Sequence, residues 1–179
     1  MNENLQYARF WDRAGAYILD ALILGSVSFG LNYLNIVNSK SFLLYLPVAV
    51  LGILYKPFME SYYGATLGKM ALDLKVTDLS YAKINFEKSL LRSLIVIAPS
   101  LFYLPVYYVA FQDPQIINTD GFLDFSLKLA STYPAVGFIT NILSVIFLAD
   151  LVVLLVNNSK NARSLKDIMA ATYVIKSKN

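Results

Sequence analysis

Two aspartates lie inside stretches of sequence that are otherwise apolar. Asp20 falls within residues 14–31, seven residues after Arg13, and Asp150 falls within FLADLVVLL. Residues seven apart are close to two helical turns apart, so Arg13 and Asp20 would project from one face of a helix. A charge in hydrocarbon costs about 3 kcal/mol on insertion scales and usually faces a bundle interior or a cavity. Asp20 is therefore either a cation or proton site with Arg13 as counter-charge, or part of a structural salt bridge or helix–helix hydrogen bond.

Asp150 would lie at a depth similar to that of Asp20. Two close carboxylates could share a cation, or one could hold a proton, because each carboxylate raises the pKa of the other. The alternative is that Asp150 pairs with a basic residue such as Arg92, and we prefer that interpretation.

The composition places these residues in a membrane protein. The chain has 179 residues, of which 57% are hydrophobic and 15% charged, whereas soluble domains are about 25% charged. About 20 apolar residues in a helix cross a hydrocarbon core about 30 Å thick. We expect an all-α fold, a single domain over residues 1–179, with four transmembrane helices at residues 14–37, 42–59, 90–111 and 133–156.

The residue types also exclude several functions. Cysteine and histidine are absent, which excludes disulfides, thiol catalysis and zinc ligation by these side chains. The sequence contains no recognisable catalytic constellation, cofactor motif or metal-ligand cluster, so we expect neither enzyme activity nor a cofactor.

Lysine and arginine are distributed unevenly among the expected loops. All but Lys40 and Lys128 of the 15 fall on one side of a four-span protein. The positive-inside rule places that side, with both termini, in the cytoplasm. Because topology explains the net charge of +3, we expect no nucleic-acid binding.

The expected loops contain secondary structure of their own. ALDLKV, residues 71–76, alternates apolar and polar residues and predicts a strand. Since strand backbone groups need partners, we expect a small cytoplasmic β-element in which this run pairs with another strand, TYVI of the tail being the proposed partner. INF, residues 84–86, could return as a further strand. Apolar residues at helical spacing over 122–129 predict a short helix on the outer surface.

Three blocks of sequence carry a family resemblance. They are RAGAYILDALIL with Arg13 and Asp20, GATLGKMALDLKVTD followed by SLLRSLI with Arg92, and NARSLKDIMAATYVI with Asp167. In order and spacing these blocks resemble the RDD family of bacterial membrane proteins, named for one arginine and two aspartates. The resemblance implies a multi-pass protein of the bacterial inner membrane. In this family a histidine often precedes the last aspartate, and this chain has lysine there.

The candidate site consists of two sets of residues. The transport or ion-binding candidates are Arg13, Asp20, Asp150 and Asp167, and the cytoplasmic motif comprises Thr66, Gly68, Lys69, Arg92 and Arg163. GATLGK is not a phosphate loop, because Met70 stands where serine or threonine is required. We expect a tight turn there, with Lys69 meeting lipid headgroups or Glu60. Arg163 and Asp167 are four apart and could pair on a helical turn.

Two functional classes follow. The first is a transporter or binder of a small solute, or of a monovalent cation exchanged for protons. It would form a homo-oligomer, because four helices barely enclose a pathway. The second is a membrane scaffold or accessory protein that docks a partner through its cytoplasmic element. In either case the lipid bilayer is a partner; small cations and protons are partners only of the transporter.

Overall fold

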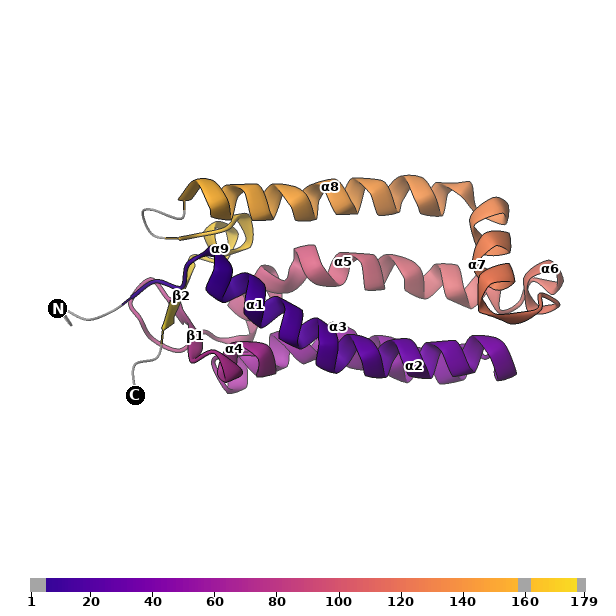
Figure 1. Ribbon diagram of the computed structural model, residues 1–179, viewed down its shortest axis with the longest axis horizontal. Helices are drawn as coiled ribbons and strands as arrows, with labels where there is room; N and C mark the ends of the chain where they lie inside the picture. Colours follow the sequence, from indigo (N-terminus) through magenta and orange to yellow (C-terminus); the bar gives the residue numbers. More distant parts are fainter. Residues whose placement is uncertain (1–5, 158–161, 177–179) are drawn as a thin grey trace.

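Four apolar segments of the sequence form long helices in the computed structural model, which describes residues 6–157 and 162–176 (Figure 1). Each of the four is long and apolar enough to cross a membrane. The first is continuous over Phe10–Ser39, and the others are α3 (Phe42–Tyr62), α5 (Phe86–Ala110) and α8 (Pro134–Val156). The predicted fold class, helical with four spans and a small sheet, is confirmed, while the side on which the termini lie stays a prediction.

The first long helix is not uniform. It consists of α1 (Phe10–Asp20), the π-helical segment η1 (Ala21–Gly25), α2 (Ser26–Leu34) and the π-helical segment η2 (Asn35–Ser39). Asp20 is therefore the last residue before a π-helical turn. π-Helical turns are rare in proteins, and those that occur are often at functional sites.

A two-stranded antiparallel sheet lies at one end of the bundle. β1 (Leu74–Asp78) pairs with β2 (Thr172–Lys176), so that Leu74 faces Lys176 and Asp78 faces Thr172. The predicted pairing of the loop with the tail is confirmed. Two short helices, α4 (Leu67–Ala71) and α9 (Leu165–Met169), lie beside the sheet. We call this region, with the adjoining ends of the long helices, the sheet end.

The prediction that INF, residues 84–86, forms a further strand is wrong. Asn85 caps α5 by accepting a hydrogen bond from the Lys88 backbone N–H at 2.9 Å, and Phe86 is the first helical residue. An isolated bridge between Lys83 and Thr77 is the only ladder contact of this region in the described chain. The capping signal of asparagine outweighs the apolar pattern here.

The opposite end of the bundle is closed by α6 (Pro114–Ile117) and α7 (Gly121–Thr132). Figure 1 shows α7 running across the ends of the long helices. Phe125 and Leu129 of α7 are buried against Ile36, Ala110 and Ile116. The predicted helix in this loop is confirmed, and its location on the outer surface stays a prediction.

Candidate functional site

A buried arginine lies at the centre of the sheet end. Arg92 of α5 is 0% exposed. Its Nε donates to Glu60 Oε2 of α3 at 2.8 Å, and its Nη1 contacts the carboxylate of Asp167 in α9. Nη1 also donates to Thr172 Oγ1 of β2 at 2.8 Å. One side chain thus joins two spans, the C-terminal helix and the sheet.

Asp167 extends this network to the first helix. Its carboxylate forms an ion pair with Arg13 of α1 and accepts hydrogen bonds from the Ser164 backbone N–H at 2.9 Å and hydroxyl at 3.2 Å. Burial opposes the ionised form of Asp167, but Arg92 and Arg13 outweigh it and hold the pKa of Asp167 well below its ordinary value. Asp167 is therefore an ionised link between α1, α5 and α9.

Glu60 holds α4 in a similar way. Its carboxylate is fully buried and contacts both Lys69 of α4 and Arg92. Burial lowers the pKa of Lys69 to about 8, although the charge of Glu60 favours the protonated form. Of the two predicted partners of Lys69, the structure has Glu60. Arg13, Glu60, Lys69, Arg92 and Asp167 together form what we call the buried charge network.

Asp20 lies beside this network and does not pair with Arg13. Its carboxylate accepts hydrogen bonds from the Tyr55 hydroxyl at 3.0 Å, the Thr66 hydroxyl at 2.6 Å and the Gly68 N–H at 2.7 Å. Because Thr66 and Gly68 belong to the first turn of α4, the carboxylate of Asp20 caps that short helix from outside. The expected Arg13–Asp20 pair is replaced by one between Arg13 and Asp167.

Gly68 makes this close approach of α1 and α4 possible. A Cβ atom at position 68 would lie 2.1 Å from the Ala16 carbonyl oxygen and 2.9 Å from the Asp20 nitrogen. Both contacts are with backbone, which cannot rotate away as a side chain can. Only glycine fits between the helices here.

A separate ion pair joins α8 to α9. Asp150 accepts a hydrogen bond from the Lys166 backbone N–H at 2.9 Å and also contacts the Lys166 ammonium. Asp150 thus has a basic partner, as we preferred, but the partner is Lys166 and not Arg92. Burial lowers the pKa of Lys166, and Asp150 partly offsets this effect. Lys166 thus holds α9 against α8 through its contacts with Asp150.

The predicted side-chain pair of Arg163 and Asp167 is wrong. Arg163 donates to the main-chain oxygen of Asp167 at 3.0 Å, and its guanidinium lies 5.2 Å from the centroid of the Tyr173 ring. The reason is local, because α9 begins only after Ser164, whose side chain and Asp167 form a capping box. Arg163 therefore precedes the helix, and helical spacing does not apply to it.

A cavity of about 440 Å³ opens next to the network. Its wall comes from all four spans and from the short helices α4 and α9. Its charged lining residues are Arg13, Asp20, Lys56, Lys69, Arg92 and Lys166. Asp20 is the one carboxylate on this wall among the described residues. The rest of the wall is mainly apolar, with Leu24, Val96, Phe147 and Leu151 among its residues. We call this space the larger cavity.

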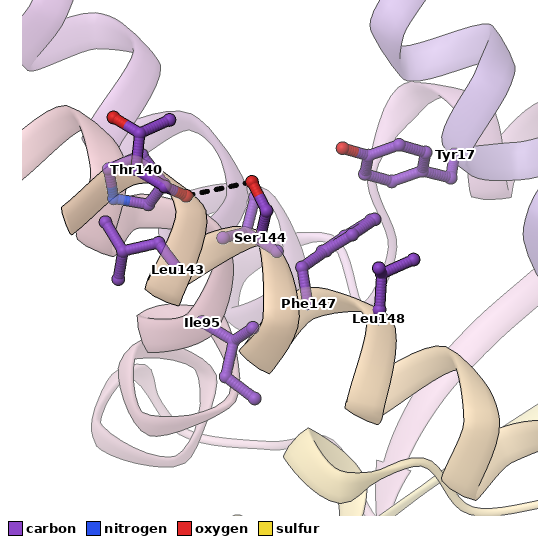
Figure 2. A pocket seen from close by; sticks show the side chains of 9 residues that line it. Tyr17, Ile95, Thr140, Leu143, Ser144, Phe147 and Leu148 are labelled. Carbon is purple, nitrogen blue, oxygen red and sulfur yellow. Dashed lines mark hydrogen bonds between the residues drawn. The ribbon is translucent and has the colours of Figure 1, made fainter. Parts of the chain in front are cut away.

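A smaller cavity of about 340 Å³ lies between Tyr17 of α1 and residues of α5 and α8 (Figure 2). Its polar groups on α8 are already paired, because the Ser144 hydroxyl donates to the Thr140 carbonyl at 2.9 Å. The Thr140 hydroxyl in turn lies 2.9 Å from that of Tyr103. No charged residue lines this cavity in the described part of the chain, so the chemistry belongs to the larger one.

Comparison with protein families connects this geometry to a known group. The RDD family model matches residues 7–171, most of the chain. The chain belongs to the RDD family. A search of curated proteins finds no match to this chain. In this RDD protein the arginine and aspartates of the motif divide into two structures. Arg13 and Asp167 join the buried charge network, whereas Asp20 caps α4 at the wall of the larger cavity.

Several residues of the site were not singled out from the sequence. The sequence indicates Glu60 only as a partner of Lys69, yet Glu60 also pairs with Arg92. Lys56 and Glu60 are one helical turn apart at the end of an apolar span, and this charged i, i+4 pair was the available signal. Tyr55, which donates to Asp20, carries no comparable signal, because tyrosine is common at the ends of spans.

Proposed function

We propose that this RDD protein binds a small charged solute in the larger cavity and transports it across the bacterial inner membrane. The observation that carries the proposal is the position of the cavity. It lies among four spans, with charged residues at the sheet end and apolar residues toward the middle of the bundle. Ligand sites are typically concave and mostly apolar, with a few convergent polar groups.

Proton exchange is supported by Lys69. Its pKa of about 8 lies near physiological pH, where a modest change in surroundings alters the charge. Lys69 lies one residue after Gly68, so the ion pair of Lys69 with Glu60 and the hydrogen bond of Gly68 to Asp20 are both made by α4. A solute that alters this end of the cavity would therefore alter proton binding.

Exchange of a monovalent cation for protons is a second candidate, favoured by the presence of Asp20 on the cavity wall. Two observations weigh against it. Both oxygens of Asp20 already accept hydrogen bonds. In addition, the described residues contain no cluster of three acidic side chains that could hold a metal ion.

The test is proton flux in vesicles that contain the purified protein and an entrapped pH-sensitive dye. Sodium, potassium, phosphate and carboxylate salts are added in turn to the wild type and to Asp20→Asn. We expect one class of salt to drive proton movement, and Asp20→Asn to abolish it per folded molecule. Lys75→Gln, which removes an exposed charge outside the cavity, is the matched control. Absence of flux with every salt would refute transport and favour the scaffold class, in which the sheet end docks a partner.

Four further proposals accompany transport. The sheet end and both termini face the cytoplasm, because the basic residues gather there. The protein has no enzyme activity. It functions without a cofactor. It assembles as a homo-oligomer, which would enclose a pathway that four helices leave open.

A further inference from the structure

The wall of the larger cavity has an excess of positive charge. Its cations are Arg13, Lys56, Lys69, Arg92 and Lys166, and its carboxylate is Asp20. Three more carboxylates, those of Glu60, Asp150 and Asp167, contact the lining cations without lining the cavity. With every group counted in its ionised form, five cations stand against four carboxylates. An anion beside Lys56 would favour the protonated ammonium and complete this balance of charge.

Two of the lining cations have hydrogen-bonding capacity to spare. Nη2 of Arg92 is buried and has no hydrogen-bond partner among the described residues. Lys56 has neither a hydrogen bond nor an ion pair in the same part of the chain, although Glu60 follows it by one helical turn. A buried donor without a partner is costly, and an oxyanion is the acceptor that satisfies guanidinium and ammonium groups best.

The remaining wall is mainly apolar, which a bare inorganic anion would not require. Leu24, Val96, Phe147 and Leu151 line it. Gly25 and Gly52 also line it, and a Cβ atom built at either position meets nothing within 4 Å. Space therefore continues from the charged end along the apolar part of the spans. The shape and chemistry fit a molecule with two different ends.

We propose that the larger cavity binds an anionic amphiphile. Its carboxylate or phosphate head lies at Lys56 and Arg92, and its apolar body lies along η1, α3, α5 and α8. This inference rests on the proposed function for the location of the site, and it names the substrate class. The amphiphile comes either from the bilayer, as an anionic phospholipid, or from solution, as a molecule such as an alkyl phosphate.

The test measures binding, so that it is independent of flux. The full-length protein is placed in nanodiscs of phosphatidylcholine with a minor fraction of phosphatidylglycerol, and the retained lipids are identified by native mass spectrometry. Dodecyl phosphate and inorganic phosphate are titrated separately into protein in phosphatidylcholine nanodiscs. Retention of phosphatidylglycerol identifies the bilayer as the source, and binding of dodecyl phosphate without that retention identifies the solution. Either result supports the inference.

Variants of the two ends of the cavity locate the ligand. We expect Lys56→Gln to weaken binding about tenfold, as loss of one charge-assisted contact would, and Lys56→Arg to retain it. Gly52→Leu should block the apolar part, because its side chain enters open space. The matched controls are Lys75→Gln, outside the cavity, and Gly30→Leu, whose Cβ also meets nothing within 4 Å but which does not line the cavity.

Three results would overturn the inference. The first is equal retention of phosphatidylglycerol and phosphatidylcholine together with no binding of dodecyl phosphate. The second is binding of inorganic phosphate as tight as that of dodecyl phosphate, which would leave the apolar wall without a role. The third is unchanged binding in both Lys56→Gln and Gly52→Leu. Binding of the amphiphile without any flux would refute transport and leave this inference intact.

Discussion

Replacement of Gly68 by alanine tests whether α1 and α4 are held together as the structure has them. The added Cβ atom would lie 2.1 Å from the Ala16 carbonyl oxygen, which is closer than a normal hydrogen bond between heavy atoms. α4 must therefore move away from α1 by about 1 Å or more. The hydrogen bond of 2.7 Å from the Gly68 N–H to Asp20 would not survive such a movement.

The expected cost follows from these contacts. A hydrogen bond to a charged group contributes about 1.5–3 kcal/mol, and forced expansion of a packed contact costs about 1–3 kcal/mol. The higher helix propensity of alanine offsets about 1 kcal/mol of this loss of stability. We therefore expect Gly68→Ala to lower the free energy of unfolding by about 1.5–5 kcal/mol.

The assay is reversible unfolding of the purified protein in mixed micelles, followed by circular dichroism. Gly30→Ala is the matched control, because a Cβ atom at position 30 meets nothing within 4 Å. It should be neutral or stabilise the protein by up to about 1 kcal/mol. If both variants changed stability by the same amount, the close contact of α4 with α1 would be refuted.

Three further predictions concern the charge network and topology. Asp167→Asn should lower the free energy of unfolding by about 3–5 kcal/mol, because it removes the buried negative charge that Arg13 and Arg92 share and leaves Arg92 with Glu60 alone; a loss below 1 kcal/mol in the same unfolding assay would contradict this. Burial lowers the pKa of Lys69 to about 8, below about 10.4 in the unfolded chain, so the unfolded chain binds more protons between these pH values. Lys69 should therefore make stability rise with pH in that window, by about 1.4 kcal/mol per unit at most, and Lys69→Gln should reduce the slope by that amount. Finally, Ser80→Cys should resist an impermeant thiol reagent in intact cells and Ser131→Cys should react; the reverse pattern would place the sheet end outside.

The four helices and the pairing of β1 with β2 were accessible from the sequence, for physical reasons. A span must be apolar over about 20 residues, and a strand with period-two patterning must find a partner for its backbone. Only a few segments of this chain satisfy each requirement, so the choices were limited. The strand predicted at INF does not form, because three residues are too few to show a reliable alternating pattern and Asn85 among them caps α5.

The sequence indicates which charged residues belong to the site, but it does not indicate which residues they pair with. Arg13 and Asp20 share a helix at suitable spacing, yet each binds a residue distant in sequence, Asp167 and Gly68 respectively. The spacing of residues along one helix indicates which of their side chains could contact each other. Tertiary packing decides which of these contacts form. Glu60 shows the same point, because its contacts come from α4 and α5.

The structure also shows why stability and function must be measured together in this protein. Arg92 and Lys69 line the larger cavity and hold the fold through Glu60, and Asp20 lines it while capping α4. Loss of flux in a variant of any of these residues could follow from unfolding alone. Lys56 and Gly52 differ, because they line the cavity without an ion pair or a close contact among the described residues. If the cavity is the site, changes at Lys56 and Gly52 will reduce binding while the unfolding transition stays where it is, and no purely structural role produces that combination.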